Sequence, residues 1–214
     1  MRWTVVIPAK SLPAAKSRLA PMSADPRSHR RLVEAIRADT IAAASHAEPV
    51  ARVLLVVDRA GPTDGPDVLV QTRPGLNEAV AEAAEYAART WPEDGIAALV
   101  GDLPALRADE LARALDAAAG HASAFVPDTA ASGTTLLAGT PGNVLSPAFG
   151  PRSAARHAAR AVAIPAGAGL RHDVDTADDL LDAATRLGVG AATRAVLSDL
   201  GVTARSPCLG MIAP

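Results

Sequence analysis

Short apolar runs alternate along the chain with longer, alanine-rich segments, a pattern that predicts β-strands separated by α-helices. The clearest strand is 4–7, a continuous apolar run that stops at Pro8 and is typical of a strand buried on both faces. We expect further strands at 53–57, 68–71, 96–100, 124–126 and 162–164, and a segment at 134–137 that can pair beside 124–126.

Helices are predicted at 27–47, 75–90, 108–119, 153–161, 176–187 and 191–200. In the first of these, Leu32, Ile36 and Thr40 recur every fourth residue and therefore share one face. Ser153 and Thr176 are expected to cap the helices that begin there, because a hydroxyl oxygen can accept a hydrogen bond from an unpaired backbone N–H. Strands separated by helices of this length predict βαβ units and a mostly parallel sheet of the α/β class.

The chain is expected to form one domain over residues 1–200, followed by a loosely held C-terminal tail at 201–214. Its 214 residues suffice for a core without disulfides or structural metals. No internal repeat and no long Pro/Gly/Ser-rich linker divides the sequence. The oligomeric state is left open by the sequence, with a homodimer as one expectation.

Composition and charge exclude some classes of partner. Lys plus Arg number 21 and Asp plus Glu number 23, so the basic surface of a nucleic-acid-binding protein is missing. Aromatic residues, which would stack on single-stranded bases, make up only 2% of the chain. No apolar run is long enough for a signal-peptide core or a membrane span. The single cysteine, Cys208, cannot form an internal disulfide, which fits a cytoplasmic protein.

Candidate binding residues follow the predicted strands, where the ligands of open α/β sheets bind. Asp102 comes directly after the strand at 96–100, with Gly101 before it and Pro104 after it. A carboxylate there is well placed to hold Mg²⁺, which typically takes one or two protein carboxylates together with substrate phosphates. An ordinary turn or helix-cap aspartate has the same appearance in a sequence, so both interpretations stay open.

A second group of carboxylates occurs at Asp173 and Asp175, which flank Val174. In an extended segment both would face the same side and would repel each other unless a cation lay between them. This favours a metal site for at least one of the two. The alternative is that Asp175 supports the start of the helix at Thr176 while Asp173 is exposed.

Cations and small polar residues come after other predicted strands. Lys10, Lys16 and Arg18 follow the first strand and could offset phosphate charge, although Lys and Arg are more often solvated surface residues. The Rossmann G-x-G-x-x-G and Walker A patterns are both absent. The turns at 132–135 and 150–153 offer backbone N–H and hydroxyl donors for a phosphate, or serve as turns alone. The five histidines lack metal-ligand spacing, and His157 is better explained as a structural residue.

Several of these segments occur in a distinctive order. They are Ile7-Pro8-Ala9-Lys10 with Ala15-Lys16-Ser17-Arg18-Leu19, Gly101-Asp102-Leu103-Pro104, Gly133-Thr134-Thr135, Phe149-Gly150-Pro151-Arg152-Ser153-Ala154-Ala155-Arg156-His157 and Asp173-Val174-Asp175-Thr176. Over residues 4–200 the chain therefore resembles the guanylyltransferase family of deazaflavin coenzyme F-420 biosynthesis. Archaeal members of that family use 2-phospho-L-lactate, and actinobacterial members use phosphoenolpyruvate.

The resemblance implies a Rossmann-like nucleotidyltransferase fold of the glycosyltransferase-A-like type, with three α/β/α layers. It implies transfer of GMP from GTP to phosphoenolpyruvate with Mg²⁺, giving enolpyruvoyl-2-diphospho-5′-guanosine and diphosphate, and a downstream transferase that accepts the product. The Ala- and Arg-rich composition favours phosphoenolpyruvate over 2-phospho-L-lactate, the alternative acid. The resemblance assigns the metal to Asp102, Asp173 and Asp175, the acid to Thr135, Gly150 and Ser153, and the nucleotide to Lys10, Lys16, Arg18, Gly75 and Asn77, with Lys16 also assisting catalysis.

One departure and two rival interpretations accompany the resemblance. Many members read Gly-Thr-Gly-Thr where this chain has Ala131-Ser132-Gly133-Thr134-Thr135, which leaves the geometry of the turn before Thr135 open. Another nucleotidyltransferase would usually carry a Gly-rich loop after the first strand, and the sequence Pro8-Ala9-Lys10 lacks it. A non-catalytic nucleotide sensor on the same fold would need fewer carboxylates than this chain offers.

Overall fold

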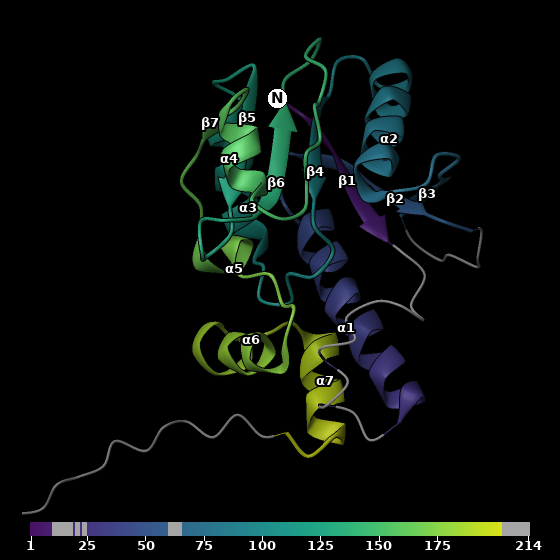
Figure 1. Cartoon of the computed structure of the whole chain (residues 1–214), viewed down its shortest axis with the longest axis vertical. Helices are drawn as coiled ribbons and strands as arrows, with labels where there is room; N and C mark the ends of the chain where they lie inside the picture. The colour runs from purple at the N-terminus through teal and green to yellow at the C-terminus, as the bar shows by residue number, and fades with distance from the viewer. Residues whose placement is uncertain (10–18, 20–21, 23–24, 60–65, 203–214) are drawn as a thin grey trace, which may run out of the picture.

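The computed structural model describes residues 1–9, 19, 22, 25–59 and 66–202 (Figure 1). The predictions made for Lys10, Lys16, Arg18 and Cys208 lie outside these residues. Within them, no helix is both long enough and apolar enough to cross a membrane.

A seven-stranded sheet forms the centre of the molecule, with the strand order β3-β2-β1-β4-β6-β5-β7. Only β6 runs against its neighbours, pairing antiparallel with both β4 and β5, and the other pairs are parallel. The mostly parallel α/β sheet predicted from the sequence is therefore confirmed. The strands are β1 (Trp3–Ala9), β2 (Val50–Val57), β3 (Asp67–Val70), β4 (Gly95–Leu99), β5 (Ser123–Pro127), β6 (Thr134–Gly139) and β7 (Val162–Ala163).

The helices fall close to the predicted segments, with one short addition, α5, between β7 and the Asp173 segment. The predicted helix at 176–187 is divided, because its second half adopts π-helical geometry, labelled η3. The helices are α1 (Pro26–Ser45), α2 (Leu76–Thr90), α3 (Ala108–Ala118), α4 (Ser153–Ala158), α5 (Ala168–Arg171), α6 (Ala177–Asp182), η3 (Ala183–Leu187) and α7 (Ala191–Asp199).

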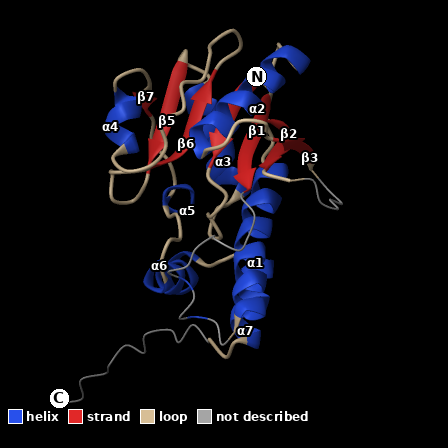
Figure 2. Cartoon of the chain, turned by 45° about the vertical axis from the view of Figure 1, so that its right-hand side comes forward, coloured by secondary structure: helices blue, strands red, loops and turns tan. Residues whose placement is uncertain are grey.

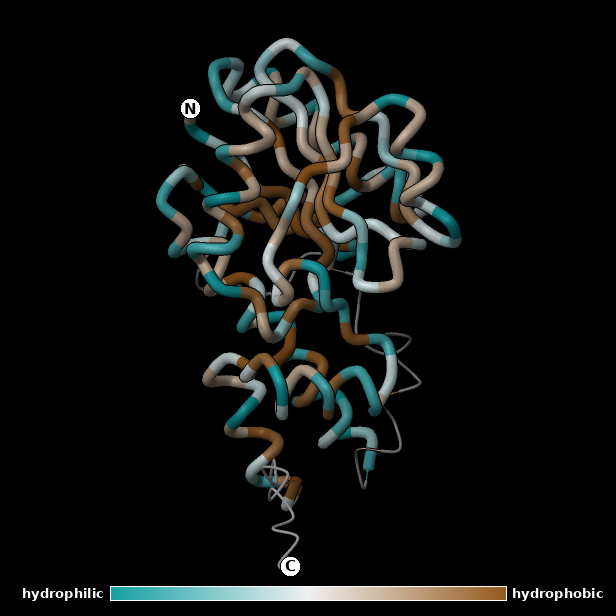
Figure 3. Tube along the Cα trace, turned by 90° about the vertical axis from the view of Figure 1, so that its left-hand side faces the viewer, coloured by the Kyte–Doolittle hydropathy of each residue, from teal (hydrophilic) through white to brown (hydrophobic). Residues whose placement is uncertain are grey.

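Two hydrophobic clusters cover the two faces of the sheet, because successive strand residues point to opposite sides. Val5 and Ile7 of β1 belong to a cluster with α3 and the end of α1. Val6, between them, belongs to a second cluster with α2 and α4. The result is a three-layer α/β/α arrangement, in which the most hydrophobic part of the chain lies in the central strands (Figure 3).

A third hydrophobic cluster lies beyond the carboxyl ends of the parallel strands. Leu32 and Ile36 in the first half of α1 pack there with Leu180 of α6 and Leu197 of α7. Figures 1 and 2 both show α1 running past the sheet to α6 and α7 at one end of the molecule. Helix α1 therefore links this cluster to the sheet, and its middle section passes the sheet edge at which the strands end.

One cap prediction is confirmed and the other is wrong. The Thr176 hydroxyl accepts a hydrogen bond from the backbone N–H of Asp179 and caps α6 as expected. Ser153 is instead the first residue inside α4, and the N-cap position belongs to Arg152, whose left-handed backbone (φ 59°) turns the chain into the helix. The buried Ser153 side chain therefore does not cap the helix end.

Candidate active site

The carboxyl edge of the sheet gathers most of the described candidate residues. Strands β1, β2, β4 and β5 end there, and β6 begins there because it is antiparallel. The loop after β4 carries Asp102, the turn between β5 and β6 leads to Thr135, and the segment after α5 carries Asp173. Residues more than 70 positions apart in the sequence thus meet at one edge.

Helix α1 fixes the position of the loop that carries Asp102. The buried Thr40 hydroxyl donates to the carbonyl of Ile36 (3.1 Å) and accepts from the backbone N–H of Leu103 (2.9 Å). Just before Asp102, a Cβ on Gly101 would lie 3.3 Å from the Ile7 side chain, so a residue without a side chain suits the close passage over β1. Asp102 is therefore held, half-buried, beside the end of β1.

A backbone hydrogen bond brings Asp173 to Asp102. The N–H of Val174 donates to the carbonyl oxygen of Asp102 at 3.0 Å, and the Val174 side chain is fully buried in the third cluster. Asp173, which is half-buried, and Asp175, which is exposed, flank Val174.

Gly169 has no side chain, which allows the α5 segment to pack closely against the loop after β4. A Cβ on Gly169 would lie 2.3 Å from the carbonyl oxygen of Ala105 and would overlap Glu110 as well. The Glu110 carboxylate accepts hydrogen bonds from the backbone N–H groups of Gly169 (3.2 Å) and Arg107 (3.3 Å). The loop after β4 and the segment around α5 are therefore joined through one carboxylate.

The environment of Asp173 favours its uncharged form. Burial, followed by the negative charges of Asp102, Asp175 and Asp128, raises the pKa of Asp173 to about 7. Carboxylates that cluster in this way ionise together when a cation neutralises them. Burial and neighbouring negative charge thus both disfavour ionised Asp173, and a divalent metal ion would relieve the repulsion between the carboxylates.

The donor set fits Mg²⁺ held by two carboxylates and substrate oxygens. Among the described residues no group of three or more His, Cys, Asp and Glu side chains is arranged to hold a metal ion. Mg²⁺ usually keeps waters or phosphates beside one or two protein carboxylates, so Asp102 and Asp173 suffice. Asp175 is exposed and adds its charge nearby.

The turn before Thr135 is organised by Asp128, which sequence reasoning left out of the site. The Asp128 carboxylate accepts hydrogen bonds from the backbone N–H groups of Ser132 (2.9 Å) and Gly133 (2.8 Å). A Cβ on Gly133 would lie 2.4 Å from an Asp128 oxygen, so glycine is required there. An aspartate directly after a strand and five residues before a glycine was the available sequence signal.

The same turn is joined to the start of α4. The backbone N–H of Ala154 donates to the carbonyl of Ser132 at 3.1 Å, which places the buried Ser153 beside the turn that leads to the buried Thr135. Gly150 has φ of +110°, a conformation that side chains rarely adopt. The three residues assigned to the acid therefore belong to one connected group of turns.

Asn77 and Arg156 hold the loop that contains Gly150. The Asn77 amide both accepts from the N–H of Phe149 (2.7 Å) and donates to its carbonyl (3.1 Å). Arg156 donates to the carbonyl oxygens of Ala148 (2.7 Å) and Phe149 (3.2 Å). Gly75, with φ of +109°, sits at the N-terminus of α2 next to Asn77. Asn77 thus connects the predicted nucleotide segment to the predicted acid segment.

His157 is a structural residue, as the sequence suggested. Its Nε2 accepts the backbone N–H of Ala148 (2.9 Å), so in the neutral ring Nδ1 carries the proton and donates to Thr134 Oγ1 (2.8 Å). Burial, and then the charge of Arg156, lowers the pKa of His157 to about 4. The imidazole therefore stays neutral while it links β6 to the loop before Gly150.

The neutral His157 is expected to make folding pH-dependent. Below pH 6.5 the unfolded chain gains a proton that the folded chain, with its pKa of about 4, does not, so the contribution of His157 to the free energy of unfolding falls as the pH drops from about 6.5 to about 4, by up to about 3 kcal/mol. An NMR titration, with the resonance assigned by its loss in His157→Gln, should place the His157 midpoint near pH 4. A midpoint near 6.5 would contradict the buried neutral ring.

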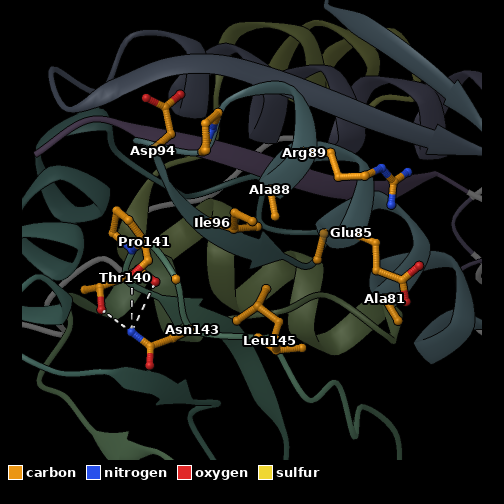
Figure 4. A pocket seen from close by; sticks show the side chains of 14 residues that line it. Ala81, Glu85, Ala88, Arg89, Asp94, Ile96, Thr140, Pro141, Asn143 and Leu145 are labelled. Carbon is orange, nitrogen blue, oxygen red and sulfur yellow. Dashed lines mark hydrogen bonds between the residues drawn. The ribbon is translucent and has the colours of Figure 1, made fainter.

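A pocket of about 390 Å³ lies at the opposite edge of the sheet, between α2 and the loop after β6 (Figure 4). Ala88 and Ile96 line its apolar floor, and Glu85, Arg89 and Asn143 are also among its lining residues. Asp94 and Thr140, which also line it, precede β4 and follow β6, so the pocket is separated from Asp102 by the length of these strands. It contributes no residue to the carboxyl-edge site.

Known proteins resemble this chain over nearly its full length. Phosphoenolpyruvate guanylyltransferase of Geodermatophilus obscurus is 46% identical over 210 residues, covering 91% of this chain and 94% of the relative. The protein of the same name from Streptomyces avermitilis is 45% identical over 212 residues, covering 94% and 96%.

Solved structures share the fold at low sequence identity. A Desulfovibrio desulfuricans protein titled a nucleotide-diphospho-sugar transferase superposes with a TM-score of 0.69 at 17% identity, covering 93% of this chain and 95% of that one. The 2-C-methyl-D-erythritol 4-phosphate cytidylyltransferase of Thermus thermophilus gives a TM-score of 0.51 at 18% identity, covering 86% and 97%. The nucleotidyltransferase-like α/β fold expected from the sequence is therefore confirmed.

The decisive comparison is with the family described as "Guanylyl transferase CofC like", which matches residues 3–207, nearly the whole chain. The match includes the loop after β4, the β5–β6 turn and the segment of Asp173, where the structure places the clustered carboxylates. This chain is a member of the CofC-like guanylyl transferase family.

Proposed function

We propose that this protein transfers GMP from GTP to phosphoenolpyruvate, releasing diphosphate, as a step in coenzyme F-420 biosynthesis. The observation that best supports this proposal is the proximity of Asp102 and Asp173 at the carboxyl edge, which the hydrogen bond from the backbone N–H of Val174 to the carbonyl oxygen of Asp102 brings about. Relatives about 45% identical over almost the full length bear the name phosphoenolpyruvate guanylyltransferase, which supports phosphoenolpyruvate over 2-phospho-L-lactate.

The reaction requires alignment and charge neutralisation more than proton transfer. A phosphate oxygen of phosphoenolpyruvate attacks the α-phosphorus of GTP, a new P–O–P bond forms, and the bond to the β-phosphate oxygen breaks. A phosphate monoester is largely dianionic near neutral pH, so its oxygen needs no general base. This agrees with the structural role of His157, whose ring contacts Thr134, next to Thr135, and the backbone of Ala148. The protein's contribution is to hold two anions close together.

Asp102 and Asp173 would hold Mg²⁺, with Asp175 supplying further negative charge. When bound, the metal neutralises phosphate oxygens and so lets both polyanionic substrates enter the site. A protein of the same fold, Rv0371c of Mycobacterium tuberculosis, has been solved with manganese (TM-score 0.51, 21% identity, covering 85% of this chain and 97% of that one), which is in keeping with a divalent cation here.

The two substrates would lie in adjoining parts of the site, because Asn77 joins the start of α2 to the loop before Gly150. Thr135, Gly150 and Ser153 would bind phosphoenolpyruvate, because their turns are joined beside β6. Gly75 and Asn77 at the start of α2 would approach the nucleotide, and Lys10, Lys16 and Arg18 would face its phosphates.

We further place the reaction in the cytoplasm, with a downstream transferase that takes the product. We treat residues 1–200 as one domain, because α1 contributes to two hydrophobic clusters.

The test is diphosphate release from GTP and Mg²⁺ with phosphoenolpyruvate, with 2-phospho-L-lactate or with neither acid. Release is expected with phosphoenolpyruvate and to stop when EDTA removes the metal. A preference for 2-phospho-L-lactate would keep the mechanism and change the acid. Nucleotide binding without diphosphate release in any mixture would identify a sensor instead and would overturn the proposal.

A further inference from the structure

Arg37 lies on α1 where that helix passes the carboxyl edge of the sheet. Thr40, three residues further along α1, holds the backbone N–H of Leu103, and residues three apart lie on the same helix face. Arg37 is half-buried, and the carboxylates of Glu34, Asp102 and Asp58 lie within electrostatic reach of its guanidinium. The residue therefore faces the loop that carries Asp102.

Asp58 and Asp102, which are far from Arg37 in the sequence, show where its guanidinium lies in the fold. Asp58 directly follows β2, Asp102 follows β4, and β1 lies between these strands in the sheet. The guanidinium of Arg37 is thus within electrostatic reach of carboxylates on both sides of β1. The chain passes from β1 to β2 and β3 on one side of this point and from β4 to β5 and β6 on the other, and open α/β sheets bind their ligands in the crevice outside such a switch point.

Other arginines near the site have different partners. Arg171 donates to the carbonyl oxygens of Pro127 (3.2 Å) and Asp128 (2.8 Å), and Arg156 donates to those of the loop before Gly150. Both side chains therefore hold protein loops in place. Arg37 instead faces carboxylates, one of which is the proposed metal residue Asp102.

We propose that Arg37 binds the triphosphate of the nucleotide beside the metal held by Asp102, an inference that rests on the proposed function. Phosphates bound to that metal would come into the range of the guanidinium, whose planar N–H groups match phosphate oxygens in pairs. The charge of Arg37 would then stabilise the diphosphate as it leaves. Lysine would replace the charge but not the paired geometry.

The burial of Arg37 is compatible with this role. Burial lowers the pKa of the Arg37 guanidinium, while Glu34, Asp102 and Asp58 act in the opposite direction. An arginine remains protonated near neutral pH under such conditions. A partly desolvated cation interacts more strongly with an incoming phosphate than a fully solvated one does, because the local dielectric constant is lower.

The test compares Arg37→Gln and Arg37→Lys with Arg30→Gln, a matched change of an exposed arginine on the same helix. Steady-state diphosphate release gives KM for each substrate, and product inhibition gives the affinity for diphosphate. For Arg37→Gln we expect KM for GTP and the inhibition constant for diphosphate to rise about 10- to 100-fold, with KM for phosphoenolpyruvate within about twofold. For Arg37→Lys, KM for GTP and the inhibition constant for diphosphate should fall between the values for Arg37→Gln and the wild type. Arg30→Gln should have the wild-type values of both.

Three results would overturn the assignment of Arg37. The first is unchanged KM for GTP in a folded Arg37→Gln protein. The second is an equal rise in KM for both substrates together with a lower melting temperature, which indicates structural damage alone. The third is a loss of Mn²⁺ affinity in the nucleotide-free protein as large as the rise in KM for GTP, which indicates that Arg37 acts only through Asp102. Absence of diphosphate release from the wild type would instead refute the proposed function, so the two failures are distinguishable.

Discussion

Replacing Asp102 by asparagine is expected to lower kcat by on the order of a thousandfold while the protein stays folded. The amide is uncharged and binds Mg²⁺ poorly, so the attacking and leaving phosphates lose the cation that neutralises them. The fold should survive because two hydrogen bonds that hold this loop are made by its backbone and because the buried Leu103 side chain is unchanged. The carbonyl of Asp102 accepts from Val174, and the N–H of Leu103 donates to Thr40. Diphosphate release and a thermal melt of the same preparation measure both effects.

Asp116→Asn is a matched control for Asp102→Asn. Asp116 is an exposed aspartate on α3, so the same loss of one negative charge occurs away from the carboxyl edge. This variant should keep kcat within about twofold, as surface substitutions usually do. If Asp102→Asn retained wild-type turnover, the metal assignment would be wrong even if the family membership stood.

Asp173→Asn is expected to remove activity and at the same time to stabilise the metal-free protein. The pKa of Asp173 is raised to about 7 in the folded state, from an ordinary value of 3.8. Between these values the unfolded chain has lost a proton that the folded chain retains, so stability falls as the pH rises from about 4 to about 7. Above pH 7 the ionised side chain therefore lowers the free energy of unfolding, by on the order of 2 kcal/mol once solvent screening at this partly exposed group is allowed for.

Denaturant unfolding in EDTA at a series of pH values tests this expectation. At pH 8, Asp173→Asn should be more stable than the wild type by on the order of 2 kcal/mol, and at pH 4 the two should be equal. Mg²⁺ should stabilise the wild type at pH 8 and the variant much less, because only the wild type gains a bound cation. Equal stability of the two proteins at pH 8 would show that Asp173 is not under electrostatic strain.

The pH dependence of Asp173 runs against that of His157 over the same window. Between about pH 4 and 6.5, rising pH costs stability through Asp173 and restores it through His157. The two contributions largely offset each other in the wild type, so its stability should change little there. In Asp173→Asn the opposing contribution of Asp173 is absent, so the loss of stability on acidification should become steeper.

Local sequence patterns determined the secondary structure and the class of fold. The continuous apolar run of β1 and the helical spacing in α1 are properties of neighbouring residues, so they can be read without knowing the rest of the fold. The placement of Asp102 directly after β4 follows for the same reason, because ligand residues of open α/β sheets come at strand ends. The cap at Thr176 was also predictable from its own helix.

The antiparallel insertion of β6 and the backbone turn at Arg152 depended on tertiary structure. A short strand such as 134–139 has no local signal for direction, and its place between β4 and β5 is set by pairing with both. Ser153 looked like a cap because it begins a helix, but the N-cap position belongs to Arg152, whose left-handed backbone has no signal in the sequence.

The site itself required the fold. Asp102 meets Asp173 through a backbone hydrogen bond between residues 72 positions apart, and Asp128 adds its charge from a third segment. Arg37 comes within electrostatic reach of Asp102 only because α1 packs against the loop after β4 through Thr40. The sequence by itself determined which residues lie at strand ends, since secondary structure is local. Only tertiary packing decided which of those ends meet, because groups far apart in the sequence interact electrostatically or by hydrogen bonds only where the fold brings them close together.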